Sequence, residues 1–209
     1  MRSAASRTAG LFMVHRLPWI ATSLRKDSPP SMLTWTTTNT PLGCLTLVGS
    51  ARGLSHVYFD GESPDLRSMQ RLTDVTEPGS AGAVLVDASQ QIAEYFAGTR
   101  RDFELLLAVP ESPRTFRDRA QRALRDIPFG ERWTYSALAT AAGSAQAARA
   151  AGSACATNPL PIVVPCHRVV PAGGGVGSYR GGAAAKQMLL DHEAVCCGTN
   201  PQRALGNHG

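Results

Sequence analysis

Residues 134–158 read TYSALATAAGSAQAARAAGSACATN, and this stretch predicts two short helices joined by a tight turn. Alanine and leucine favour helix on both sides of Gly143-Ser144, where glycine favours a turn. Such a pair has the outline of a helix-turn-helix, although alanine-rich helix pairs also occur as ordinary packing units. The second run contains small residues that permit close approach, either to a binding partner or to another helix: Ala147, Ala148, Ala150, Ala151, Gly152 and Ala154.

Strand-like sequence precedes this stretch. Residues 33–39, 44–50 and 54–61 are short runs rich in threonine, valine, leucine and aromatic residues, with turn residues between them. Their short connections predict a three-stranded antiparallel meander. Helical spacing over 84–98 then predicts a helix that ends at a glycine, and residues 102–110 predict a further strand.

Together these patterns predict an α+β fold. An N-terminal α/β subdomain with a three-stranded antiparallel sheet spans 32–111, and a helical C-terminal subdomain with a winged helix-turn-helix and a cysteine-bearing loop spans 112–194. Residues 1–31 are a basic N-terminal extension, predicted to be disordered, and residues 195–209 are a tail. The extension resembles an organellar transit peptide and equally an upstream start, since Met32 opens the patterned region.

Charge is distributed unevenly along the chain. The net charge is +5 overall, but residues 32–111 hold five arginines against ten acidic residues, whereas residues 112–186 carry a net charge of +7. The basic segment favours a polyanion such as nucleic acid, with a solvated arginine-rich helix as the alternative. No apolar run approaches the roughly 20 residues that a membrane helix needs, which excludes an integral membrane protein.

The five cysteines form an odd set without a paired framework: Cys44, Cys155, Cys166, Cys196 and Cys197. They indicate reduced thiols in an intracellular compartment. No two of them have C-x-x-C spacing, and the histidines do not cluster with them at the separations of zinc ligands. We therefore predict no zinc site.

The segment NPLPIVVPCHRVVPAGGGVGSYRGG, residues 158–182, carries the chemistry. Residues 162–164 predict a buried strand, and a proline then places Cys166 just past its end. His167 and Arg168 follow directly, and cationic neighbours favour the nucleophilic thiolate over the thiol. Most buried cysteines are inert core residues, but here two polar, titratable side chains interrupt the apolar run.

At these residues the sequence resembles the O6-alkylguanine-DNA alkyltransferases, also called methylated-DNA–protein-cysteine methyltransferases. The family signature P-C-H-R-V stands at 165–169, and further family motifs stand in family order at 134–138, 147–150, 158–162, 177–182 and 189–193. The resemblance covers about residues 32–194 and is strongest over 112–194. It implies DNA repair by direct reversal, in which the alkyl group of O6-methylguanine, and of O4-methylthymine, moves irreversibly to Cys166 once per molecule.

The resemblance also implies roles for single residues. Cys166 is the alkyl acceptor, His167 is the base, acting through a water, and Glu193 is the carboxylate that orients the histidine. Asn158 links the recognition helix to the cysteine loop, and Tyr135 helps to rotate the nucleotide out and polarises the base. The residues matched to the substrate pocket are Pro161, Val169, Tyr179, Arg180 and Lys186. Arg180 is expected to narrow the pocket against bulky alkyl groups, and a surface salt bridge is the alternative for Lys186.

On the DNA side, Arg149 is matched to the arginine that enters the stack where the flipped base stood. The small residues Ala148, Ala150 and Gly152 suit docking in the minor groove. Residues 173–177 are expected to form a wing-like hairpin. The expected partner is double-stranded DNA that contains O6-alkylguanine, bound by a monomer without a cofactor, metal, membrane or obligatory protein partner. The expected location is the cytoplasm of a bacterium or the nucleus of a eukaryote, with organellar targeting by residues 1–31 as a further option.

Three other functions compete for the same residues. A non-catalytic lesion binder would carry a different residue in place of Cys166. A cysteine hydrolase would use Cys166, His167 and Glu193, but it leaves Arg149 and the basic segment without a purpose. A DNA-binding regulator explains the two helices but leaves residues 165–168 idle. The alkyltransferase uses all of these features.

Overall fold

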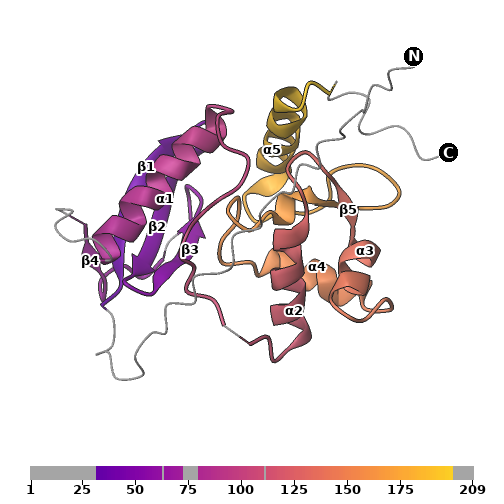
Figure 1. Cartoon of the computed structure of the whole chain (residues 1–209), viewed down its shortest axis with the longest axis horizontal. Coiled ribbons are helices and arrows are strands. Elements are labelled where there is room, and N and C mark those ends of the chain that lie inside the picture. Colours follow the sequence, from indigo (N-terminus) through magenta and orange to yellow (C-terminus); the bar gives the residue numbers. More distant parts are fainter. Residues whose placement is uncertain (1–31, 63, 73–79, 111, 200–209) are drawn as a thin grey trace, which may run out of the picture. The chain divides into compact units, whose positions relative to one another are not determined.

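The computed structural model describes residues 32–62, 64–72, 80–110 and 112–199 (Figure 1). The predicted extension at 1–31 and residues 200–209 of the predicted tail lie outside these residues. Three strands and a long helix come first in the chain, and a series of shorter helices with a second long helix follows, which confirms the predicted α+β fold. Among the described residues, no helix combines the length and apolar character that crossing a membrane requires.

An antiparallel meander opens the fold, as the sequence predicts. The strands β1 (Thr34–Thr40), β2 (Gly43–Ser50) and β3 (Gly53–Tyr58) pair in chain order. A two-residue strand that the sequence analysis did not identify, β4 (Gln70–Arg71), pairs in parallel with β1. The sheet order is therefore β3-β2-β1-β4.

Helix α1 (Ala81–Phe96) lies across one face of this sheet (Figure 1). Ser80 caps its start, because the Ser80 hydroxyl accepts a hydrogen bond from the Ala83 N–H at 3.2 Å. Gly98 follows its end with φ of +75°, as expected for a glycine that stops a helix. The apolar stripe of the helix is fully buried and contains Leu85, Ala88, Ile92 and Tyr95.

The prediction of a strand at residues 102–110 is wrong. This segment makes only an isolated bridge between Leu54 and Leu107, with the Leu54 N–H donating to the Leu106 carbonyl at 2.8 Å. Further along β3, the Val57 N–H donates to the Pro159 carbonyl at 2.8 Å. The edge of β3 that faces away from β2 therefore bonds to two separate segments, one around Leu107 and one at Pro159. Neither segment forms a continuous ladder with β3.

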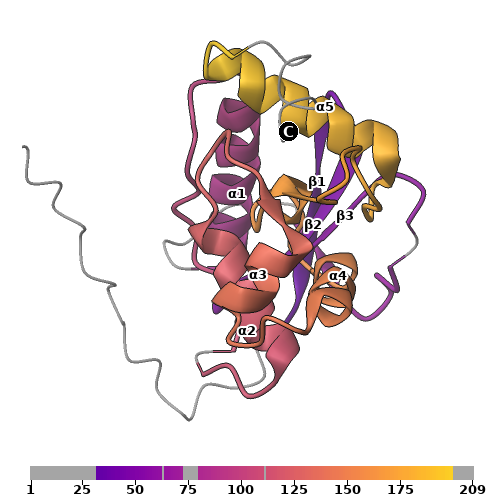
Figure 2. The same ribbon diagram turned by 90° about the vertical axis from the view of Figure 1, so that its right-hand side faces the viewer.

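The rest of the chain is mostly helical, as predicted. Its elements are α2 (Phe116–Ala123), η1 (Leu124–Asp126), β5 (Trp133–Thr134), α3 (Tyr135–Ala141), α4 (Ala148–Ala156), η2 (Cys166–Arg168), β6 (Val169–Val170) and α5 (Gly182–Cys196). The helices α3 and α4 form the predicted helix-turn-helix and lie side by side, with α2 packed against both (Figure 2). Gly143 in the turn has φ of +84°, which explains the glycine there.

Two local predictions near the cysteine are wrong. Residues 162–164 are buried as expected, but they form a turn rather than a strand, with Ile162 at φ of +74°. A β-branched residue rarely adopts a positive φ, so the surrounding prolines and the Asn158 side chain must hold this shape. Residues 173–177, predicted as a wing-like hairpin, form a loop in which several glycines have positive φ. A short parallel pair, β5 with β6, is found instead.

One hydrophobic core joins the sheet and the helical part. It contains Leu47 and Ile92 from the first part together with Leu138, Ile162 and Leu189 from the second. The cysteine-bearing loop belongs to the same cluster, so it is packed between the two parts rather than displayed on the surface of one.

We expect Gly53→Ala to destabilise the protein far more than Gly61→Ala. Both glycines have positive φ, +127° and +85°, but a Cβ on Gly53 would lie 2.5 Å from the Leu106 carbonyl oxygen, whereas Gly61 has open space around it. The expected losses in the free energy of unfolding are about 1 kcal/mol for Gly61→Ala and about 3 kcal/mol for Gly53→Ala. Denaturant unfolding of both variants measures them, and equal losses would contradict the close packing of residues 102–110 on β3.

Candidate active site

Cys166 lies at the start of η2 and is 2% exposed. Its Sγ accepts a hydrogen bond from the Asn158 Nδ2 at 3.1 Å. The same Asn158 amide donates to the Val164 carbonyl at 2.8 Å, and the Asn158 Oδ1 accepts from the Leu160 N–H at 3.1 Å. Asn158 therefore folds the loop 158–166 around its own side chain and holds the thiol in one position.

The Cys166 thiol is protonated in this environment at neutral pH. Burial raises its pKa to about 11, although the hydrogen bond from Asn158 and the charge of Lys186 act in the opposite direction. The prediction that His167 and Arg168 favour the thiolate is wrong, because both of these side chains bond to Glu193 instead. Reaction at the sulfur therefore needs a base.

His167 is buried beside Cys166 and is held through one ring nitrogen. Its Nε2 lies 2.9 Å from the Glu193 Oε1, and since a carboxylate only accepts, this nitrogen carries the proton. The other nitrogen, Nδ1, is buried and makes no hydrogen bond to any residue that the structure describes, so the thiol does not bond to it directly. Burial lowers the pKa of His167, although Glu193 acts to raise it. The ring is neutral at pH 7, with Nδ1 as a free acceptor.

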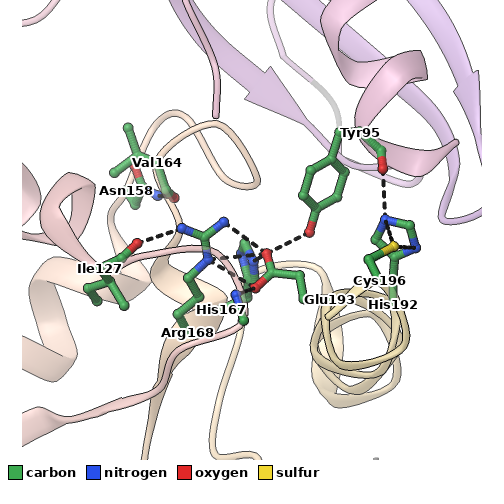
Figure 3. A network of polar contacts seen from close by, with 10 residues as sticks. Tyr95, Ile127, Asn158, Val164, His167, Arg168, His192, Glu193 and Cys196 are labelled. Carbon is green, nitrogen blue, oxygen red and sulfur yellow. Dashed lines mark hydrogen bonds and ion pairs between the residues drawn. The ribbon is translucent and has the colours of Figure 1, made fainter. Parts of the chain in front are cut away.

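The Glu193 carboxylate accepts hydrogen bonds from several parts of the chain (Figure 3). Besides His167, its donors are the Tyr95 hydroxyl at 2.9 Å, the Gly130 N–H at 2.9 Å, and the Arg168 guanidinium at 3.0 to 3.1 Å. The Arg168 Nη1 also donates to the Ile127 carbonyl at 2.6 Å. Glu193 is 1% exposed, so these contacts replace its water shell.

The donors around Glu193, with His167 first and Arg168 next, keep this carboxylate ionised. Burial alone would raise the pKa of Glu193, but the hydrogen bonds from His167 and Arg168 and the positive charge beside it lower the pKa to about 2. Burial and the neighbouring Glu193 raise the pKa of Tyr95 well above its usual value, so Tyr95 remains a donor.

Three of these partners were missed by the sequence analysis. Arg168 was assigned to the thiolate, and neither Tyr95 nor Gly130 was a candidate site residue. The hydrogen bond between Tyr95 and Glu193 spans 98 positions, which no local pattern reveals. For Arg168, the signal was available: a charged residue within an otherwise buried run needs a buried partner.

The residues matched to the substrate pocket lie around the same loop. Lys186 is 1% exposed, and its Nζ donates to the Val169 carbonyl at 2.6 Å and to the Ser178 carbonyl at 3.4 Å, so it makes no surface salt bridge. Burial lowers the pKa of Lys186. The Tyr179 ring stands edge-on to the His167 ring at 6.4 Å, and Pro161 is buried in the turn.

Arg180 is only partly buried and lies where two parts of the chain meet. Its Nε forms an ion pair with the Glu62 Oε1 at 2.7 Å, and its Nη1 donates to the Asn158 carbonyl at 3.3 Å. The structure therefore brings Arg180 next to the cysteine loop, but it directs the guanidinium to the first subdomain.

The residues matched to DNA binding lie on the helix-turn-helix. Arg149 and Ala150 are exposed on α4, and Ala148 and Gly152 are half-buried. Tyr135 begins α3, and its ring lies 3.8 Å from where a Cβ on Gly152 would stand. The Lys186 Nζ lies 5.9 Å from the centre of the same ring. Tyr135 thus connects the exposed helix to the cysteine loop.

All five cysteines are free thiols. Within residues 32–62, 64–72, 80–110 and 112–199, no group of three or more histidine, cysteine or carboxylate side chains is arranged to hold a metal ion. In the first subdomain, His56 contacts the Ser55 hydroxyl at 3.2 Å and stacks on Tyr58.

The family models that match the chain describe two domains of one protein family. Residues 33–109 match the "6-O-methylguanine DNA methyltransferase, ribonuclease-like domain", and residues 115–195 match the "6-O-methylguanine DNA methyltransferase, DNA binding domain". The methylated-DNA–protein-cysteine methyltransferase of Mycolicibacterium paratuberculosis is 36% identical over 164 residues, covering 76% of this chain and 91% of that protein. The constitutive enzyme of Bacillus subtilis is 36% identical over 163 residues, covering 77% and 95%.

Solved structures agree with these relatives. The O6-methylguanine methyltransferase of Mycobacterium tuberculosis has a TM-score of 0.67 and 33% identity, covering 78% of this chain and 94% of that one. The structure of the Mycobacterium tuberculosis OGT in complex with DNA also has a TM-score of 0.67, with 32% identity and the same coverage.

We expect Glu193→Gln to lower the free energy of unfolding by about 3 to 5 kcal/mol, because a neutral amide leaves the buried Arg168 charge uncompensated. Tyr95→Phe removes one hydrogen bond and is expected to cost about 1 kcal/mol. Glu94→Gln breaks a partly exposed ion pair with Arg100 and serves as the control with little expected effect. A Glu193→Gln variant as stable as the control would contradict this arrangement.

Because of the Glu193 carboxylate, we also expect the free energy of unfolding to fall at acidic pH. Since the pKa of Glu193 falls from 4.5 to about 2 on folding, the folded chain binds fewer protons, and this part of the stability is lost as the pH falls from 4.5 towards 2. His167, whose pKa is also lowered from 6.5, adds a loss that begins below pH 6.5. Unfolding free energies measured across this range should decline more steeply in the wild type than in Glu193→Gln.

Proposed function

The chain belongs to the methylated-DNA–protein-cysteine methyltransferase family, and from that premise we propose that Cys166 is the residue that receives the alkyl group. The protein is a DNA-repair enzyme that binds DNA and transfers an alkyl group to a cysteine. The observation that carries the proposal is the buried arrangement in which Asn158 holds the Cys166 thiol while Glu193 holds the adjacent His167. Burial also raises the pKa of Cys155, the other buried thiol among the described residues, to about 12.

In the proposed reaction, the Cys166 sulfur attacks the methyl carbon of O6-methylguanine. The S–C bond forms as the bond between that carbon and O6 breaks, and the electron pair of the broken bond stays with the guanine. The thiol proton moves to the neutral His167 at Nδ1, through a water, and finally to the guanine, which leaves as the ordinary base. Glu193 supports this step because it fixes the tautomer that leaves Nδ1 free.

Base flipping follows from the depth of the thiol. A sulfur that is 2% exposed does not reach an alkyl group inside a duplex, so the nucleotide has to rotate out at a cost of a few kcal/mol. The exposed Arg149 on α4 is suited to fill the space that the base leaves. The small side chains at Ala148, Ala150 and Gly152 support docking of α4 in the minor groove.

The stability of the product determines the expected stoichiometry, and the displacement reaction determines the expected substrate range. A thioether at Cys166 is stable, so each molecule is expected to act once, as a monomer on double-stranded DNA that contains O6-alkylguanine. The same displacement applies to O4-methylthymine, which presents a methyl group on an equivalent oxygen. Pro161, Val169, Tyr179 and Lys186 surround the Cys166 loop and are the proposed walls of the pocket.

Intact-protein mass after incubation with an oligonucleotide duplex holding one O6-methylguanine tests the proposal. We expect one added methyl, about 14 Da, on Cys166 of the full-length protein, and none in Cys166→Ser. Uptake should stop at one methyl per chain with excess DNA. Tight lesion binding without a mass change would support a non-catalytic binder, and neither binding nor a mass change would contradict the repair function.

A second experiment separates the rotation of the nucleotide out of the duplex from the methyl-transfer step. We expect Arg149→Ala to slow methyl transfer from duplex DNA by about tenfold or more, because the vacated stack is left unfilled, while transfer from free O6-methylguanine base remains at the wild-type rate. Arg67→Ala is the matched control, since Arg67 is a highly exposed arginine of the first subdomain. Equal slowing on the duplex and on the free base would argue against the assigned role of Arg149.

A further inference from the structure

We propose that the Arg180–Glu62 ion pair positions the reactive loop, so that the first subdomain takes part in setting the reactivity of Cys166. Arg180 acts as a positioning residue in this inference, since it does not contact the sulfur itself. The inference rests on the proposed function, because the reaction it modifies is alkyl transfer to Cys166.

Arg180 makes three contacts in three directions. Its Nε pairs with the Glu62 Oε1 at 2.7 Å, its Nη1 donates to the Asn158 carbonyl at 3.3 Å, and its guanidinium lies 5.1 Å from the centre of the Tyr58 ring. Glu62 is itself held, because its Oε2 accepts from the Phe59 N–H at 2.7 Å. The planar guanidinium therefore links a fixed point of the first subdomain to the main chain of Asn158.

The link reaches the thiol through a single residue. Asn158 offers its carbonyl to Arg180 and its side-chain amide to the Cys166 sulfur at 3.1 Å. The next residue, Pro159, accepts a hydrogen bond from the Val57 N–H of β3 at 2.8 Å. The peptide groups on both sides of this position are thus tied to the first subdomain, and a shift of either tie would move the amide that bonds to the sulfur.

The same part of the first subdomain also supports the wall formed by Tyr179. The Tyr179 ring packs edge-on against Phe59 at 5.6 Å, and a Cβ on Gly181 would lie 2.8 Å from that phenylalanine ring. Arg180 sits between these two residues, so the segment 179–181 is seated on Phe59 and anchored by Glu62 in its middle. Both the thiol loop and the pocket wall depend on one short stretch of the first subdomain.

A comparison within the chain separates positioning from stability. The Arg100–Glu94 pair has the same N–O distance of 2.7 Å and similar side-chain exposure, 24% and 32% against 21% and 29% for Arg180–Glu62. Arg100 also donates to a main-chain carbonyl, that of Asp102, at 3.0 Å. The two pairs are alike in chemistry and differ in what they hold, since Arg100–Glu94 has no contact with the Cys166 loop among the bonds formed by the described residues.

The test uses full-length Arg180→Gln, Glu62→Gln and the double variant, with Arg100→Gln as the matched control. Single-turnover methyl transfer from an O6-methylguanine duplex, measured over a range of DNA concentrations, gives the saturating rate and the half-saturating concentration. Alkylation of Cys166 by iodoacetamide, mapped by mass, measures thiol reactivity without DNA. Thermal unfolding checks that all variants remain folded.

We expect Arg180→Gln to lower the saturating rate about tenfold, the size expected for losing one hydrogen bond to a charged group, with an unchanged half-saturating concentration. The double variant should be no slower than Arg180→Gln, because the two side chains act as one unit. Iodoacetamide alkylation of Cys166 should change in the same variants, and Arg100→Gln should match the wild type in every readout. Arg180→Lys keeps the positive charge but not the planar guanidinium with its several donors. Its saturating rate should therefore lie between those of Arg180→Gln and the wild type.

Wild-type saturating rates and alkylation in Arg180→Gln and Glu62→Gln would overturn the inference. A rise in the half-saturating concentration alone would also overturn it, since Arg180 would then be a DNA contact. A wild-type protein that transfers no methyl contradicts the proposed function instead, and in that case the iodoacetamide comparison alone decides whether the pair positions Cys166.

Discussion

Burying a carboxylate costs free energy unless its oxygens find donors, and Glu193 meets this constraint with donors from distant parts of the chain. Tyr95 comes from α1, Gly130 from the loop before β5, and His167 and Arg168 from η2. The carboxylate is satisfied only when all of these segments are in place. The orientation of the His167 ring, and with it the position of the unbonded Nδ1, therefore depends on the whole fold.

The Cys166 thiol differs from the Glu193 carboxylate, because burial keeps it in its uncharged form. Among the described residues, the group bonded to the Cys166 sulfur is the neutral Asn158 amide, and burial raises the pKa of the thiol to about 11, so it rests as a neutral group. A protonated and shielded sulfur is slow to react with oxidants or stray electrophiles. If Cys166 receives the alkyl group as proposed, a resting state of low reactivity preserves the thiol for that transfer.

Local patterns were sufficient to predict the meander, α1 and the helix-turn-helix. For these elements, the periodicity and the glycine turns agree with the structure within a few residues, as at Gly98 and Gly143. The errors arose where distant contacts override the local preference. Residues 162–164 look like a strand, but Asn158 bends them into a turn, and the strand predicted at 102–110 competes for an edge that Pro159 occupies. The signature motif located the cysteine and the histidine, whereas Tyr95 and Gly130 were recognised as donors to Glu193 only in three dimensions.

The shared core bears on how this protein could be divided or reused. Apart from the main cluster, the separate apolar cluster found among the described residues consists of three alanines in the helical part: Ala120, Ala142 and Ala154. The larger apolar residues of that part, such as Leu138 and Leu189, pack in the cluster that also contains Ile92 of α1. The helix-turn-helix half is therefore not a transplantable module. A fusion protein that borrows it without the sheet would present an unpaired apolar face to solvent and would be prone to aggregate.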